Sequence, residues 1–305
     1  MEKVNPVVQA EKESTRCCNF HRTFRTHCRK KYSMRFWSSL TRFVALAFLL
    51  VCLALNALGQ SDKALLWKIT GPDLSAPSYL FGTYHLLTDN FFNTLTETAG
   101  PLKAAKGVVV ETIIDSARIA NVAGIMVMPG QKISNLVTPA DFKLVSDEVE
   151  QTMGVSLAQF DQMKPLTIAL MITMGYAQKG NAETLARYAG KPMDYHIAAT
   201  GKWQAKTVTQ LETMEEQFKL LYDAFPVEEQ ARQLVALVKQ KEFAATAQVK
   251  LLELYLAKDM PGLHAYAESM PKDFGNSDFL LKNRNERWMN VLPGLMAARP
   301  RAIPS

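Results

Sequence analysis

Helical periodicity in the second half of the chain constrains the fold most strongly. Apolar residues recur every three to four positions over 138–199 and again from Thr213 onwards, with glycines and prolines as breaks. Such spacing places the apolar side chains on one face of a helix, so both stretches are predicted to be helical. Thr213 and Glu216 have the spacing of a capping box, which predicts the start of a helix there.

Four short segments have the composition of β-strands. LLWKIT and SYLFGT flank GPDLSAP, whose glycine and prolines are typical of a turn, and together they predict a β-hairpin. GVVVETII is a β-branched run typical of a buried strand, and KWQAKTVTQLET predicts one more short strand. The expected fold class is therefore α+β, with a small mixed β-sheet near the N-terminus and a large helical region in a single domain.

The basic residues of the chain are concentrated in its first 59 residues. These hold ten Lys and Arg and three Asp and Glu, a net charge of +7, whereas the remainder has a net charge of −1. The formal charge of +6 therefore comes from the first 59 residues and not from a basic binding face of the remaining chain. We accordingly expect no nucleic-acid partner.

Residues 34–59 have the pattern of a cleavable signal peptide. Two arginines form a basic start, 43–55 form an apolar stretch, and small residues at 57 and 59 precede a cleavage site. The apolar stretch is shorter than the about 20 residues that span a bilayer, so we expect no stable membrane span after cleavage. An uncleaved signal anchor is the alternative. The protein is expected to be exported, to the periplasm, the outer surface or the medium.

Residues 1–33 match no signal architecture, and we interpret them as an extension upstream of a true start at Met34. All four cysteines of the chain lie before residue 60, and the adjacent pair Cys17 and Cys18 lacks the usual spacing of zinc ligands. The functional domain is then 60–305. It is expected to contain neither a disulfide nor a cysteine nucleophile.

Gly82 and His85 form a Gly-x-x-His unit at the end of the second predicted strand. Glycine there permits a backbone geometry or a close approach that a side chain would block, and an imidazole can bind a metal or move protons near pH 7. Glu111 stands at the corresponding place after the three valines of GVVVETII. If the two strands are neighbours, His85 and Glu111 meet on one rim and supply two of the ligands of a catalytic metal. Taken singly, a histidine at the end of a strand is more often a hydrogen-bonded structural residue, and a glutamate there is often solvated or caps a helix.

Four segments, in their order and separations, resemble the TraB/PrgY/GumN family from about Leu65 to the C-terminus. They are LLWKITGPDLSAPSYLFGTYHLL, AKGVVVETIIDS, PMDYHIAATGKWQAKTVTQLETMEEQ and LKNRNERW. The Wnt-inactivating Tiki proteases resemble the same family. The resemblance implies an extracytoplasmic protein with a metal-dependent peptidase site of the manganese or cobalt class. That site is built from two Gly-x-x-His motifs and a strand-end glutamate.

The resemblance assigns roles to individual residues of this chain. Gly82 becomes the turn residue, and His85 and Glu111 become both catalytic residues and metal ligands. Arg284 is a further catalytic candidate, which could orient Glu111, hold a substrate carboxylate or pair on the surface. The Leu-Glu-Thr segment at 211–213 and the Arg-Asn pair at 284–285 belong to the same pattern. Their second members supply the candidate substrate-binding residues, Glu212 and Asn285.

Three further polar residues lie in predicted helices, namely Asp194, His196 and His264. Asp194 recurs in the family pattern, but a helix-surface or packing role is at least as compatible with its position. Helix capping is the alternative for Glu212. His196 and His264 match no motif and are interpreted as structural.

The second Gly-x-x-His of the family follows the Arg-Asn pair by about two dozen residues, and the sequence ends at Ser305, before it. We therefore expect an incomplete metal site and little or no peptidase activity. An exported protein that sequesters a peptide or glycan without cleaving it is the main alternative function. A metal-free, esterase-like hydrolase using His and Glu is a third. Retention of a transition metal after dialysis distinguishes the metal-dependent peptidase from the sequestering protein.

Overall fold

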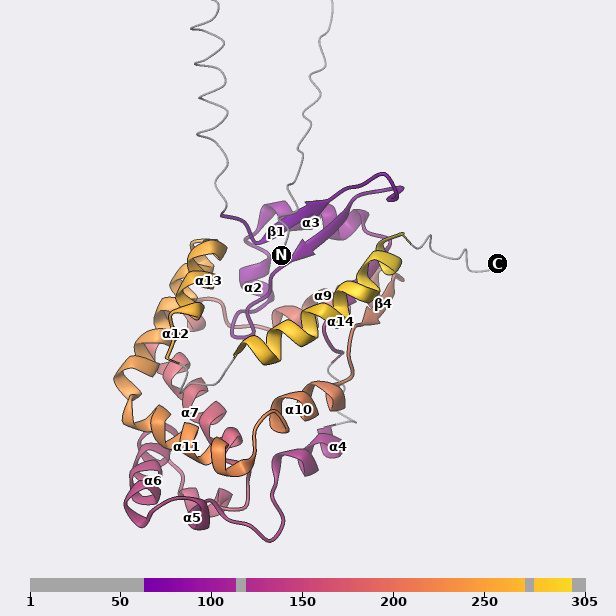
Figure 1. The fold of residues 1–305 in the computed structure, drawn as a ribbon. Helices are drawn as coiled ribbons and strands as arrows, with labels where there is room; N and C mark the ends of the chain where they lie inside the picture. Colours follow the sequence, from indigo (N-terminus) through magenta and orange to yellow (C-terminus); the bar gives the residue numbers. More distant parts are fainter. Residues whose placement is uncertain (1–62, 114–118, 272–276, 298–305) are drawn as a thin grey trace, which may run out of the picture. The chain divides into compact units, whose positions relative to one another are not determined.

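The computed structural model describes residues 63–113, 119–271 and 277–297, and residues from Lys63 onwards form one compact unit (Figure 1). The predicted upstream extension and the predicted signal peptide lie outside the described residues, and both stay predictions. No described helix is long and apolar enough to cross a membrane.

Helices make up most of the described chain, which confirms the α+β class with a large helical region. Two short 3₁₀ helices, η2 (Gly124–Met126) and η3 (Leu157–Phe160), lie between α-helices. The described α-helices are α2 (Asp89–Phe92), α3 (Thr96–Ala104), α4 (Ile119–Ala123), α5 (Ile133–Leu136), α6 (Pro139–Met153), α7 (Pro165–Gly180), α8 (Ala182–Arg187), α9 (Met193–Trp203), α10 (Met214–Tyr222), α11 (Val227–Lys239), α12 (Lys241–Leu256), α13 (Met260–Glu268) and α14 (Ser277–Ala297).

The four strands of the described residues form two separate pairs. β1 (Leu66–Ile69) and β2 (Ser78–Phe81) pair antiparallel, which confirms the predicted hairpin. β3 (Gly107–Val110) and β4 (Thr207–Gln210) pair in parallel. A parallel pair needs a long crossover connection, and the chain supplies it with the helices from α4 to α9. The single small sheet of the sequence analysis is therefore divided in two, one antiparallel and one parallel.

The prediction that the valines of β3 are a buried run is wrong. Val108 is only 6% exposed, whereas Val109 is 41% exposed. Side chains of a strand point alternately to its two faces, and α9 packs against β3 and β4 on the face that carries Val108. The strand is thus covered by α9 on one face and open on the other.

Gly201 allows α9 to approach this parallel pair closely. A Cβ atom at Gly201 would lie 2.9 Å from Cγ2 of Val108 and 3.0 Å from Cγ2 of Val208. Both neighbours are β-branched and have little freedom at χ1, so neither can rotate away. The contact sets the distance between the β3–β4 pair and the helix that carries Asp194.

Replacing Gly201 by alanine is therefore expected to lower the free energy of unfolding by about 1–3 kcal/mol, because the helix and the strands must move apart. Gly294 is the matched control, since it also lies in a helix but a Cβ atom there would meet no other atom within 4 Å. Its alanine variant should gain about 0.5–1 kcal/mol. Urea unfolding measures both variants, and an unchanged Gly201→Ala protein would contradict the close packing.

Two hydrophobic clusters form the core. The first is formed mainly by helices and includes Ile133, Val145, Val149, Ile172 and Leu234, all fully buried. The second joins the N-terminal hairpin region to α2, α9 and α12, and it includes Leu65, Leu87, Met193, Leu252 and Tyr255. This second cluster lies beneath the segment with His85, and it gives that segment a rigid support.

Candidate functional site

The segment after β2 is attached to the second cluster at Gly82. The Tyr255 hydroxyl donates a hydrogen bond to the carbonyl of Gly82 at 2.7 Å, and the Gly82 N–H donates to the carbonyl of Leu65 at 2.9 Å. The close approach expected at Gly82 is not found. A Cβ there would meet no atom nearer than 3.9 Å, and the backbone is not in the left-handed region. These hydrogen bonds, and not a requirement for glycine, fix where the chain turns towards His85.

His85 is paired with Asp194, from the first turn of α9. Nδ1 of His85 lies 3.1 Å from Oδ2 of Asp194, and the Thr83 hydroxyl donates to Oδ1 of Asp194 at 2.6 Å. Because a carboxylate only accepts, Nδ1 carries the proton of a neutral imidazole, and Nε2 is then the basic nitrogen. The His85 side chain is 78% exposed. The ring is therefore oriented at one nitrogen and open to solvent at the other.

The charges around this pair shift both pKa values. The hydrogen bond to Asp194 raises the pKa of His85, and the charges of Asp194 and Glu111 add to the increase. Burial raises the pKa of Asp194, but the hydrogen bonds from His85 and Thr83 together outweigh it and leave the pKa lowered. Both shifts favour the ion pair of imidazolium and carboxylate. Glu111 is near enough for its charge to act on His85.

We expect a titration of the imidazole by NMR in EDTA to give His85 a pKa above the usual value of about 6.5. Asp194→Asn should lower that pKa, because an amide no longer stabilises the imidazolium form. A His85 pKa that is the same in both proteins would contradict the pairing.

Glu111 lies directly after β3 and is bonded to Arg284 of α14. Nη2 of Arg284 donates to Oε2 of Glu111 at 2.7 Å, and its Nε donates to Oε1 of Glu212 at 3.1 Å. The Arg284 side chain is 15% exposed, and that of Glu212 only 3%. Trp288 stacks beneath the guanidinium, with its ring centre 4.6 Å from Cζ of Arg284. One arginine thus joins the ends of β3 and β4 to α14.

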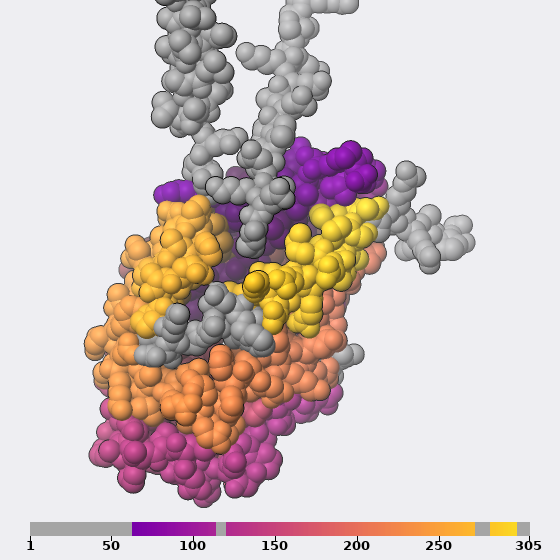
Figure 2. Space-filling model, viewed as in Figure 1, coloured from indigo at the N-terminus to yellow at the C-terminus, as the bar shows by residue number. Residues whose placement is uncertain are grey.

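The electrostatics of this group favour the charged arginine. Burial lowers the pKa of Arg284, but the hydrogen bonds to Glu212 and Glu111 reverse the effect and leave the pKa raised. In Figure 2, α14 lies on the surface of the molecule, and its Leu281 and Met289 are 52% and 63% exposed. The buried charges of Arg284 and Glu212 are therefore a main attachment of a helix that is otherwise largely exposed.

The structure places the predicted residues in two groups. His85 is held by Asp194, and Glu111 is held by Arg284, as one of the interpretations of Arg284 required. Glu212 is buried against Arg284, and its role in binding substrate stays a prediction. Asn285 is exposed on α14, and no hydrogen bond joins its side chain to another described residue.

Sequence reasoning missed part of the site. The capping alternative for Glu212 is wrong, because Thr213 caps α10 in a capping box with Glu216. Asp194, for which the sequence left a site role and a packing role open, bonds the imidazole of His85. Thr83, which bonds Asp194 in turn, was missed, and only its place inside the Gly-x-x-His unit could have indicated it. Gln217, whose Nε2 lies 3.4 Å from Oε2 of Glu111, carried no signal.

The described residues do not by themselves make a metal site. No three His, Cys, Asp or Glu side chains within 63–113, 119–271 and 277–297 come together in an arrangement that could hold an ion. His85 offers Nε2, but the carboxylate of Glu111 is already bonded to Arg284. A cation would have to compete with that guanidinium for its second ligand.

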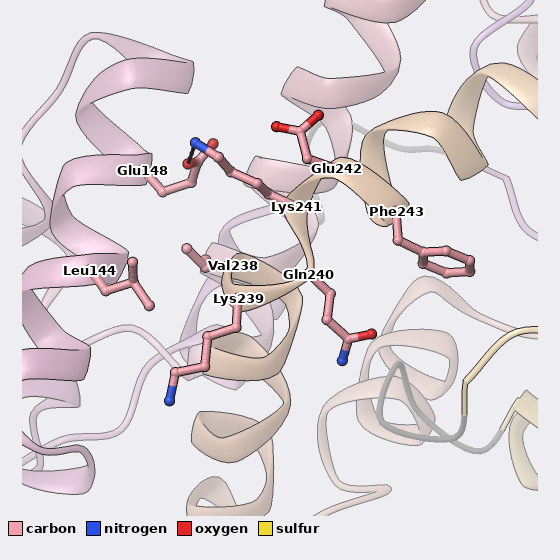
Figure 3. Close-up of a pocket in the computed structure, with 8 residues that line it drawn as sticks. All are labelled: Leu144, Glu148, Val238, Lys239, Gln240, Lys241, Glu242 and Phe243. Atoms are coloured by element: carbon pink, nitrogen blue, oxygen red, sulfur yellow. Dashed lines mark hydrogen bonds and ion pairs between the residues drawn. The ribbon is translucent and has the colours of Figure 1, made fainter.

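Two pockets differ in their relation to this site. A surface pocket of about 670 Å³ lies in the helical region between α6 and the α11–α12 junction (Figure 3). Its buried Glu148 is bonded to Lys241 at 3.1 Å and to the Tyr176 hydroxyl at 3.0 Å, and none of its residues is a site candidate. A smaller pocket of about 90 Å³ is lined in part by Asp194, the residue that is bonded to His85.

Comparison with known proteins identifies the family. The model of the TraB/PrgY/gumN family matches residues 65–303, which is most of the chain and contains both the His85–Asp194 pair and the Glu111–Arg284 group. No curated protein and no solved structure matches the chain. The family match covers the same segments that carried the resemblance in the sequence. The chain therefore belongs to the TraB/PrgY/gumN family.

Proposed function

We propose that this chain is an exported hydrolase that cleaves peptide bonds beside His85. The observation that carries the proposal is the imidazole held by Asp194 at Nδ1 and open to solvent at Nε2. A histidine oriented in this way is the usual arrangement of a general base. Peptide as the substrate class rests on the family resemblance.

The proposed chemistry is proton transfer at Nε2 of His85. Nε2 removes a proton from the attacking water, and the imidazolium then returns it to the departing amine. Asp194 keeps the proton of the neutral ring on Nδ1 and stabilises the imidazolium that forms. Thr83 holds the carboxylate through its other oxygen, so Asp194 cannot turn away from the ring.

A manganese- or cobalt-class ion, with His85 and Glu111 as its ligands, stays a prediction from the resemblance. It is an alternative to proton transfer by His85, because both need the lone pair of Nε2. Such an ion lowers the pKa of a bound water and so supplies a nucleophile near neutral pH. The described residues do not complete the ligand set of such an ion. Metal analysis after dialysis tests it, since a specific site should retain an ion in the wild type and lose it in His85→Ala.

The test of hydrolysis uses the full chain and a mixture of peptides derived from a bacterial proteome. Mass spectrometry should find new peptide termini with the wild type, in the presence of added Mn²⁺ or Co²⁺, and none with His85→Ala. The absence of new termini with the wild type would overturn the proposal. Peptides retained by the wild type without cleavage would instead favour the sequestering protein.

Export is the second part of the proposal, and the pattern of residues 34–59 supports it. A basic start, an apolar stretch and small residues before the cleavage site direct a chain to the export machinery and signal peptidase. N-terminal sequencing of the expressed protein should begin at Gln60 or close to it. A protein that begins at Met1 and stays in the cytoplasm would contradict export.

A further inference from the structure

The small pocket beside His85 has a composition that the proposed proton transfer does not use. It lies between the end of β3 and one face of α9, and its larger lining residues are Thr112, Ile113, Asp194, Tyr195 and Lys202. Two alanines complete the lining. Asp194 belongs both to this pocket and to the pair with His85, so a molecule in the pocket lies next to the candidate site.

Two polar groups of the pocket lack partners within the described part of the chain. The Thr112 hydroxyl is buried and has no hydrogen bond. Lys202 is exposed in the last turn of α9 and forms no ion pair there. A buried hydroxyl is normally satisfied, so an unpartnered one in a pocket wall indicates a place for a ligand atom or a water. Both groups donate hydrogen bonds, and both therefore suit an acceptor.

The charges of the pocket decide which acceptor fits. Asp194 is the one acidic residue that lines it, and its two oxygens are already bonded to His85 and Thr83. Lys202 is the one basic lining residue, and its charge is not balanced by another described side chain. We propose that this pocket is a substrate subsite for a carboxylate, bound by Lys202 and the Thr112 hydroxyl. The proposal rests on the proposed function and adds a substrate preference for peptides that place a carboxylate in this pocket.

The geometry of α9 also gives the position of that carboxylate along a peptide. Asp194 and Lys202 are eight residues apart, which is about 12 Å along a helix. An extended peptide covers about 3.4 Å per residue. The carboxylate is therefore expected about three residues from the bond beside His85. It belongs to an Asp or Glu side chain or to the C-terminus of the peptide.

Binding is measured first, so that the subsite can be tested without cleavage. The probes are three fluorescein-labelled Ala/Ser decapeptides that differ in one central residue, Glu, Gln or Lys, each with a free or amidated C-terminus. Fluorescence anisotropy with His85→Ala should show about three- to tenfold tighter binding of the Glu peptide than of the Gln peptide. The preference should shrink in high salt, which screens an exposed charge. An advantage of free over amidated peptides would assign the carboxylate to the C-terminus.

Two variants and one control make the assignment specific. Lys202→Glu should reverse the preference in favour of the Lys peptide. Thr112→Val should weaken binding of the Glu peptide, because valine keeps the shape of the threonine side chain but has no hydroxyl. Lys179→Glu is the matched control, because Lys179 is likewise an exposed lysine in the last turn of a helix, and it should keep the wild-type preference.

The outcomes separate this proposal from the proposed hydrolysis. A preference that follows Lys202 supports the subsite even if no peptide is cleaved, in which case the hydrolase alone fails. Cleavage by the wild type should show acidic residues or C-termini enriched about three positions from the cut bond. Equal binding of all peptides, no binding of any, or a preference unchanged by Lys202→Glu would overturn the subsite.

Discussion

His85→Ala should lower the rate of peptide hydrolysis by about 10²- to 10⁴-fold, which is the usual contribution of a positioned acid–base group. The melting temperature should stay within about 4 °C of the wild type. The two expectations differ because the His85 side chain is 78% exposed and contributes little buried surface, while its one strong contact is the pair with Asp194. Initial rates on a cleaved peptide and thermal unfolding by circular dichroism measure both.

Asp194→Asn and His264→Ala complete this experiment. The amide keeps the shape of Asp194 but no longer fixes the proton of the neutral ring on Nδ1 of His85, so the rate should fall by at least about tenfold. His264 is exposed on α13 away from the site contacts, and its alanine variant should keep the wild-type rate. Full activity of His85→Ala would remove His85 from the mechanism. Unfolding of that variant would show that the histidine has a structural role.

The helices and the hairpin could be predicted because their signals are local. Apolar spacing identified the helices, and the turn residues between LLWKIT and SYLFGT identified the hairpin. Pro261 lies at a break between helices, as the sequence predicted, because α12 ends at Leu256 and Pro261 stands in the first turn of α13. Proline is tolerated there because the first N–H groups of a helix have no partner within it.

The relation of His85 to Glu111 could not be derived from local signals. The sequence predicted that they meet on one rim if their strands are neighbours, but β2 and β3 belong to different pairs. Each is instead held by a residue distant in the sequence, His85 by Asp194 of α9 and Glu111 by Arg284 of α14. Both contacts join residues more than one hundred positions apart. Periodicity carries no information about such pairs, and only the family resemblance indicated that these segments belong to one site.

The Arg284 group gives the largest expected effect on stability. Arg284→Met should lower the free energy of unfolding by about 3 kcal/mol, because the buried carboxylate of Glu212 loses its main counter-charge. This is the lower end of the usual range. Arg287 remains, with Nη2 3.6 Å from the other oxygen of Glu212, and it compensates part of the charge. Urea unfolding of the full chain measures the loss.

A second substitution shows whether the loss comes from the unpaired charge. Glu212→Gln in the Arg284→Met background should recover a large part of the stability, because a neutral amide is less costly to bury than a carboxylate. Arg232→Met is the control, since Arg232 is 71% exposed in its pair with Glu229 and should change the stability by less than about 0.5 kcal/mol.

The Arg284→Met variant has two ways to respond, and both are measurable. If α14 detaches locally, its amides should exchange hydrogen faster while those of α7 and α11 stay protected. If the loss is shared by the whole unit, the urea midpoint should fall for every probe. Either result follows from a buried charge left at Glu212, which is only 3% exposed on its side chain. An Arg284→Met protein with an unchanged midpoint and unchanged exchange in α14 would mean that the guanidinium does not hold the helix to the ends of β3 and β4.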